Sequence, residues 1–180
     1  PIAVSAVGLS PSDQIIDYKP GASYDLGIEV ININFDPVGA TLFVDGSMKE
    51  NVVITPRNFV VPARSSVHAD IRIEMPKTPL TPGWHIIYVA ATEGSPDLVT
   101  GGTGIGTVVT VKAAIYFFIP YPGKYAEISS FIVPDTNLGD NLDIELKIKN
   151  AGKDAINLLD GYIELSVEDK VVKSIPVFTT

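Results

Sequence analysis

Apolar residues recur at every second position along most of this chain of 180 residues. In the segment SSVHADIRIEM, Val67, Ala69, Ile71 and Ile73 alternate with charged or polar residues. Because successive side chains of a β-strand point to opposite faces, this period predicts a strand with one buried and one solvated face. No long stretch has the 3.6-residue spacing of an amphipathic helix. The chain is therefore predicted to be all-β.

Turn residues divide the chain into many short strands. Clusters rich in Pro and Gly, such as KPGA, VDGS and YPGK, separate the alternating segments. Regularly spaced short strands of this kind are typical of an immunoglobulin-like β-sandwich. Strands are predicted over residues 3–9, 24–30, 40–44, 51–55, 67–73, 84–92, 106–118, 126–133, 142–148, 162–168 and 170–177.

An internal repeat suggests two tandem sandwiches. The segment GASYDLGIEVIN (residues 21–32) aligns with GDNLDIELKIKN (residues 139–150), and both place apolar residues at the same alternate positions. The first glycine, the central aspartate and the final asparagine are identical in the two segments. The repeat predicts one immunoglobulin-like domain over residues 1–120 and a second over residues 124–180, joined at PYPGK.

The second predicted domain is short. Its residues supply about four strands, whereas an immunoglobulin-like sandwich has about seven. Two explanations are open: the sequence stops inside the second domain, or a partner supplies the missing strands. The first is favoured, because an open sandwich edge beside an uncovered core promotes aggregation. We therefore expect the second domain to be partial.

Composition excludes several classes of function. The 21 acidic residues outnumber the 13 basic ones, and the net charge of −8 disfavours binding to nucleic acid or to anionic lipid. The chain has no cysteine, so disulfides and thiolate zinc sites are excluded. The longest apolar run, residues 113–121, falls short of the roughly 20 residues that cross a bilayer. Membrane anchoring is expected only through regions outside this chain.

A family resemblance rests on the segment TPRNFVVPARSSVHADIRIEMPKTPLTPGWHIIYV (residues 55–89). This segment resembles the first domain of pilus-chaperone-like, immunoglobulin-like surface modules. With KPGASYDLGIEVIN before it and GKYAEISSFIVPD after it, the layout is similar to that of WxL-interacting cell-surface proteins. Those proteins pair a peptidoglycan-binding sandwich with a second sandwich that contacts a host or partner. The resemblance implies an extracytoplasmic, secreted or cell-surface protein without catalytic activity. It assigns no binding residue.

The glycine-rich segment GGTGIG (residues 101–106) does not match a nucleotide-binding loop. A dinucleotide fingerprint needs a third glycine and a helix after it, whereas Thr107 and a predicted strand follow here. We interpret the segment as a mobile hairpin loop between two strands. Gly102, Thr103 and Gly104 are the candidate residues for ligand contact at its tip.

Three further groups of residues contain the side-chain types of functional sites. Ser65, Ser66, His68 and Asp70 include the residue types of a hydrolase triad, but they alternate along one strand and are interpreted as surface residues. A zinc site with His68 and His85 would need converging carboxylates. Calcium binding is a weak expectation for oxygen-rich residues near the predicted domain junction, because their spacing is not that of an EF-hand. These candidates are Asp135, Asn137, Asp140, Asn141 and Asp143.

Aromatic residues cluster in two segments. Trp84 and Tyr88 share a strand face, and YFFIPYP (residues 116–122) holds four more aromatic side chains. Exposed aromatic residues would suit a carbohydrate platform, but packing in a core or between domains is the preferred interpretation. In particular, Phe117, Tyr121 and Tyr125 are expected to line the domain junction.

The preferred function is a structural or adhesive module of a cell-surface or secreted protein. Its expected partner is a protein or a cell-wall polysaccharide, with no cofactor and no enzymatic activity. One alternative is a chaperone-like protein that binds a partner's strand along an exposed edge, with TVVTVKAAIYFF (residues 107–118) as that edge. A glycan-binding domain is the other alternative.

Overall fold

The computed structural model describes residues 7–78, 80–94, 109–137 and 139–179. The chain divides into two compact units, unit 1 (Pro1–Ile119) and unit 2 (Pro120–Thr180). All regular elements of the described residues are strands, apart from a single 3-10 turn, η1 (Lys49–Asn51). The prediction of an all-β, immunoglobulin-like fold is confirmed.

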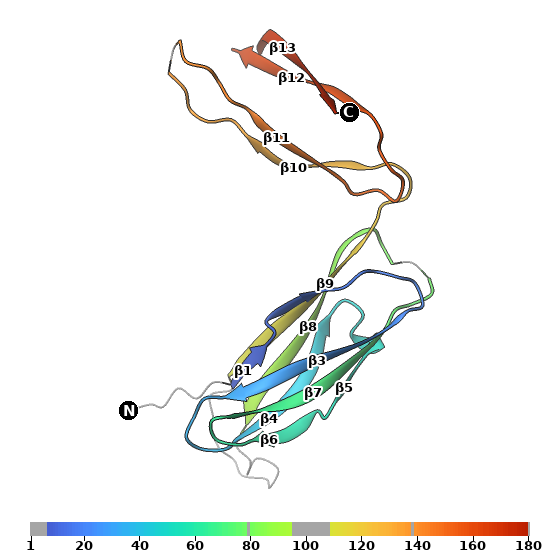
Figure 1. Cartoon of the computed structure of the whole chain (residues 1–180), viewed down its shortest axis with the longest axis vertical. Coiled ribbons are helices and arrows are strands. Elements are labelled where there is room, and N and C mark those ends of the chain that lie inside the picture. The colour runs from blue at the N-terminus through green and yellow to red at the C-terminus, as the bar shows by residue number, and fades with distance from the viewer. Residues whose placement is uncertain (1–6, 79, 95–108, 138, 180) are drawn as a thin grey trace. The chain divides into compact units, whose positions relative to one another are not determined.

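Unit 1 is a sandwich of two sheets packed face to face (Figure 1). Sheet A has four strands, in the order β1 (Val7–Ser10), β3 (Ser23–Asn32), β7 (Ser65–Glu74) and β5 (Val52–Thr55). Sheet B has five strands, in the order β2 (Asp13–Ile15), β9 (Thr110–Ile119), β8 (Gly83–Gly94), β4 (Val38–Gly46) and β6 (Asn58–Val61). The chain passes from sheet A to sheet B between β1 and β2. Strand β1 pairs antiparallel with β3, whereas β2 pairs parallel with β9.

The alternating residues of both sheets fill the core between them. In β7 the even-numbered residues from Ser66 to Glu74 are exposed, while Ala69, Ile71 and Ile73 are buried. Phe117 on β9 is fully buried and stacks on Tyr18 and His85. Full burial of one such side chain contributes about 1.5–3 kcal/mol to folding. The core of unit 1 therefore follows the two-residue period of the sequence.

Strand β9 is not an edge of its sheet. It pairs antiparallel with β8 from Gly83 to Thr92 and parallel with β2 over Ala114–Tyr116. The prediction that this segment is a free edge for strand binding is therefore wrong at its centre. The sequence-based interpretation missed β2, whose three residues carry too little pattern to be recognised.

Unit 2 consists of two separate hairpins. Strands β10 (Ala126–Ile132) and β11 (Glu145–Asn150) form one, and β12 (Leu159–Val167) and β13 (Lys170–Thr179) form the other. Both pairs are antiparallel, and each contains one bulge, after Ile128 in the first and after Leu165 in the second. Among the described residues of unit 2, neither hairpin pairs with a third strand, apart from an isolated bridge between Tyr121 and Gly152. A partial second sandwich stays a prediction.

Candidate functional site

An apolar groove of about 210 Å³ lies between the two hairpins of unit 2. On the side of β10–β11 it is lined mainly by Ile128, Leu146 and Ile148. Across from them, β12–β13 contributes Leu159, Ile163 and Val177. These residues occupy alternate positions on each strand, so the two sheets turn their apolar faces toward the same space.

The apolar faces of unit 2 stay largely open. Ile128 is 64% exposed and Phe131, on the same face of β10, is 54% exposed. Among the described residues of unit 2, only Ala151 is buried. Contiguous exposed apolar surface in a soluble protein marks a binding site or an aggregation hazard. The groove is therefore the first candidate for a functional site, and it was not predicted residue by residue.

The same asparagine-centred loop follows strand β3 in unit 1 and strand β11 in unit 2. Asn32 donates from Nδ2 to the carbonyl of Asp36 at 2.9 Å and accepts from the backbone N–H of Asn34 at 2.9 Å. Asn150 donates to the carbonyl of Asp154 at 3.0 Å and accepts from the N–H of Gly152 at 3.0 Å. The sequence repeat is thus also a repeat of structure.

In unit 1, the loop after Asn32 borders a shallow cleft of about 500 Å³. Ile31, Asn32, Ile33, Arg64, Ser65 and Ser66 line it. Asn32 is 1% exposed and also donates to the carbonyls of Val61 and Pro62, which ties the two neighbouring loops together. The guanidinium of Arg64 lies 4.0 Å from the ring centre of the exposed Phe35. The cleft is a candidate contact surface.

The outer face of sheet B carries a second apolar surface, which we call the aromatic face: Ile15, Trp84, Ile86, Tyr116 and Phe118. Strand pairing places Trp84 beside Phe118, and Tyr116 between Ile86 and Ile15. The rings of Trp84 and Phe118 lie 5.3 Å apart. Trp84 is 55% exposed and Ile15 is 75% exposed.

This arrangement corrects the interpretation of Trp84 as a core residue, whereas the core position of Phe117 agrees with that interpretation. Phe117 alone of the YFF segment points into the core of unit 1, because side chains alternate along β9. Tyr88 also lies on the outer side of sheet B, where the ammonium of Lys112 lies 5.2 Å from its ring. Tyr121 and Tyr125 stack on each other at 4.1 Å within unit 2.

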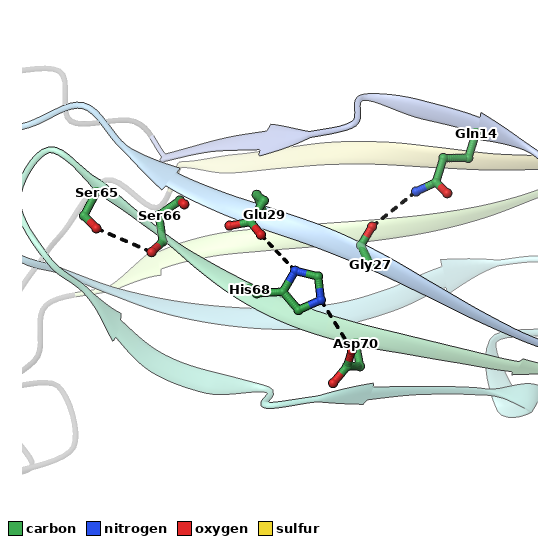
Figure 2. A network of polar contacts seen from close by, with 7 residues as sticks. All are labelled: Gln14, Gly27, Glu29, Ser65, Ser66, His68 and Asp70. Carbon is green, nitrogen blue, oxygen red and sulfur yellow. Dashed lines mark hydrogen bonds and ion pairs between the residues drawn. The ribbon is translucent and has the colours of Figure 1, made fainter.

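His68 lies on the outer face of sheet A among acidic residues, as Figure 2 shows. Its Nδ1 lies 2.8 Å from Oε1 of Glu29, and its Nε2 lies 3.3 Å from a carboxylate oxygen of Asp70. The bond to Glu29 raises the pKa of His68 above its ordinary value, and the same bond lowers the pKa of Glu29. Both side chains are exposed, so this pair is a surface contact.

The hydroxyl of Ser65 does not approach His68. Its Oγ donates to the backbone carbonyl of Ser66 at 3.5 Å (Figure 2). Because a nucleophile must lie within hydrogen-bond reach of its base, this geometry does not form a triad. The interpretation of Ser65, His68 and Asp70 as surface residues agrees with this placement.

The remaining candidates are the metal-binding residues and the glycine-rich loop. Within the described ranges, no three His, Cys, Asp or Glu side chains converge in a way that could hold a metal ion. Asp140 accepts a hydrogen bond from Asn137 at 3.2 Å, as in an ordinary turn. Calcium binding at Asp135, Asp140 and Asp143 stays a prediction. Gly102, Thr103 and Gly104 lie outside the described residues. Nothing helical in the described chain has the length and apolarity of a membrane span.

Comparisons with known proteins give weak structural similarities. No family model and no curated protein matches the chain. The E. coli chaperone DraB has a TM-score of 0.49 at 11% identity, covering 96% of this chain and 98% of DraB. The class 5 fimbriae chaperone CfaA has a TM-score of 0.49 at 14% identity, covering 97% and 99%. The ASH/PapD-like domain of human CEP192 has a TM-score of 0.44 at 11% identity, covering 62% and 83%. Similarities at this level do not extend to the role of any residue, and the resemblance to WxL-interacting proteins stays a prediction.

Proposed function

We propose that this chain is a non-catalytic binding module of the cell surface or of a secreted protein, and that unit 2 binds an extended strand of a protein partner. The observation that carries the proposal is the open apolar groove between two hairpins whose strands have no further pairing among the described residues. An extended segment that joins a sheet edge gains main-chain hydrogen bonds, while its alternate side chains enter the groove. Extracytoplasmic location and the absence of catalysis follow from the family resemblance alone.

Peptide binding tests the proposal. Ten-residue fluorescent peptides with alternating apolar and polar residues are compared with scrambled peptides of equal composition, using the 180-residue chain. We expect the alternating peptides to bind more tightly and to shift backbone amide resonances of unit 2. Equal binding of scrambled peptides, or shifts confined to unit 1, would contradict strand uptake.

A matched pair of variants locates the site. Ile148→Glu places a charge in the groove, whereas Ile132→Glu places the same charge on the outer face of the same hairpin, where the side chain is 50% exposed. Burying an unpaired carboxylate is strongly unfavourable, so Ile148→Glu is expected to weaken peptide binding by more than about tenfold. Ile132→Glu should bind as the wild type does. Circular dichroism shows whether both variants keep their strands.

A second candidate function is polysaccharide binding at the aromatic face. The specific observation is the row of outward apolar and aromatic side chains on sheet B, with the rings of Trp84 and Phe118 5.3 Å apart. An exposed aromatic ring is a flat apolar surface, and Trp and Tyr add one polar group at its edge. The apolar face of a sugar ring can stack on such a surface while its hydroxyl groups stay in water. Trp84→Ala should abolish co-sedimentation with insoluble cell-wall polysaccharide. Val53→Ala, on sheet A, should leave it unchanged, and no sedimentation of the wild type would refute this candidate.

A further inference from the structure

Two exposed apolar side chains adjoin the shallow cleft of unit 1. Ile33, which lines the cleft, is 70% exposed, and Phe35 is 79% exposed. Both belong to the loop between β3 and β4, and neither is part of the core of the unit. Apolar surface that a fold leaves open beside a cleft is typical of a binding site. The stability of unit 1 therefore does not account for these two side chains.

The two loops that carry this surface are held in a fixed geometry. The buried side chain of Asn32 donates to the carbonyl of Asp36 in one loop and to that of Pro62 in the other, at 2.9 and 3.1 Å. The backbone N–H of Arg64 donates to the carbonyl of Asn34 at 3.0 Å, and Arg64 has a φ of 51°, in the left-handed region. A site that is formed before its ligand arrives loses less conformational entropy on binding.

The guanidinium of Arg64 is held in place without being neutralised by a neighbour. It lies 4.0 Å from the ring centre of Phe35, a cation–π contact that supplies no carboxylate acceptor. No ion pair with this guanidinium occurs among the residues that the structure describes. Arginine binds a carboxylate through two parallel hydrogen bonds. The donors of Arg64 are thus open to a carboxylate.

The other cleft residues favour a carboxylate that is joined to an apolar group. Ile31 and Ser66 lie side by side on β3 and β7, and Ile33 and Ser65 continue the lining. The hydroxyl of Ser65 makes a long hydrogen bond of 3.5 Å to a neighbouring carbonyl, which it can exchange for a bond to a ligand (Figure 2). The volume of about 500 Å³ falls within the range of small-ligand sites, about 300–1,000 Å³.

Few acidic residues of unit 1 are available to the cleft. Glu29 lies in the next outward row of sheet A, and its carboxylate bonds to His68 at 2.8 Å. Strand β1 begins at Val7, which pairs with a cleft residue, and the six residues before it include no acidic one. Asp97 is the single acidic residue of residues 95–108. An acidic group of another molecule is therefore the favoured occupant.

A protein partner is favoured over a membrane. The net charge of −8 repels an anionic lipid surface, whereas a short peptide segment brings one carboxylate to a local positive charge. We propose that the cleft at Arg64 binds an acidic peptide segment of another protein, in which an aspartate or glutamate adjoins a bulky apolar residue. The carboxylate accepts two hydrogen bonds from the guanidinium, and the apolar side chain lies against Ile31 and Ile33. This site is in unit 1 and goes beyond the strand uptake proposed for unit 2.

Nuclear magnetic resonance of the full 180-residue chain tests the site. The probe is a blocked four-residue peptide in which leucine adjoins aspartate, and the matched control peptide has asparagine in place of the aspartate. The aspartate peptide is expected to shift the side-chain Nε–H resonance of Arg64 and the backbone amide resonances of Ser65 and Ser66. Equal shifts with the asparagine peptide, shifts confined to unit 2, or no shift at all would overturn the proposal.

A matched pair of variants separates the site from the general charge of the protein. Arg64→Gln removes the charge at the cleft, whereas Arg57→Gln removes the same charge from an exposed position between β5 and β6. The affinity for the aspartate peptide should fall about tenfold or more in the first variant, because a charge-assisted contact is lost, and stay within about twofold in the second. Arg64→Lys should recover only part of the affinity, because an ammonium lacks the planar fork of donors. An equal fall in both glutamine variants, with circular dichroism unchanged, would overturn the proposal.

Two further measurements decide between the proposed partner and other occupants. In Asp97→Asn, unchanged affinity for the aspartate peptide is expected, and tighter binding would mean that a carboxylate of this chain competes for the cleft. Vesicles of phosphatidylcholine and phosphatidylserine in equal parts test the membrane, and no co-sedimentation is expected. Sedimentation that Phe35→Ser abolishes would assign the surface to lipid. Either of these contrary results would overturn the choice of an acidic peptide.

Discussion

Replacing Asn32 by alanine should destabilise unit 1 more than its small loss of volume suggests. The side chain is 1% exposed and makes bonds to four backbone groups: the carbonyls of Asp36, Val61 and Pro62, and the N–H of Asn34. The carbonyl of Val61, a fully buried residue, would lose this partner away from water, at about 1–3 kcal/mol. The other three groups lie in more exposed loops, where each lost bond costs about 0.5–1.5 kcal/mol at most.

The expected loss of stability for Asn32→Ala is therefore about 3 kcal/mol, since water replaces part of the loop bonds. Urea unfolding followed by the fluorescence of Trp84, the single tryptophan of the chain, reports on unit 1. With a urea dependence of about 1–3 kcal/mol per molar, the midpoint should fall by roughly 1–3 M. The shallow cleft beside Asn32 should also lose its fixed shape, because the same amide joins the loops that border it.

Asn150→Ala is the matched control for this reasoning. Asn150 makes the corresponding bonds to Asp154 and Gly152, but it is exposed. Because water replaces both bonds, the cost should stay below about 1 kcal/mol. A free energy of unfolding for Asn32→Ala within about 0.5 kcal/mol of the wild-type value, on the order of the error of such measurements, would refute the expected role of Asn32. An equal loss of stability for the two substitutions would refute it as well. For Asn150→Ala, in unit 2, this loss is measured by amide hydrogen exchange.

Three further substitutions test the fold and its surface. Phe117→Ala removes a fully buried ring and should cost about 3–5 kcal/mol by urea unfolding; a loss below 1 kcal/mol would contradict its place in the core. Gly46→Ala should cost about 1–3 kcal/mol, because φ is +89° and a Cβ would lie 2.6 Å from the carbonyl oxygen of Ile86; an unchanged midpoint would contradict this backbone geometry. Glu29→Gln should lower the pKa of His68, measured by the titration of its ring protons, because the bond to Glu29 is the main cause of the raised value. A raised pKa in the folded state means that this bond stabilises the protein fully below pH 6.5, the ordinary value, and that the contribution is lost as pH rises through the folded pKa. The variant should therefore lose less stability over that pH range than the wild type, and an unaltered titration would exclude the contact.

The strands with long alternation are among those that the sequence predicted. Residues 67–73 and 24–30 lie within β7 and β3, because one face of each is buried and the other is wet. The aligned asparagines of the repeat also predicted equivalent positions, and the structure gives both the same loop. Such features are local, so the period of the side chains suffices to find them.

Features that depend on pairing between distant segments were missed. Strand β2 exists because its backbone joins β9, and its side chains give no period over three residues. The outward position of Trp84 and Tyr116 depends on which parity of β8 and β9 faces the core, and both parities of these strands carry apolar residues. The groove of unit 2 was likewise hidden, because alternation predicts a buried face without telling whether a second layer covers it.

Strand length distinguishes the edges of the two units and bears on the function of unit 2. The edge strands of unit 1, β1, β2, β5 and β6, have only three or four residues each. Short edges limit unwanted pairing with other chains. Strands β12 and β13 have nine and ten residues, and within the described part of the chain each is paired on one side only. Both carry exposed apolar residues. Long open edges of this kind would be selected against unless they were filled. The long edges of unit 2 are therefore expected to pair with a strand of a partner, whereas the short edges of unit 1 are not.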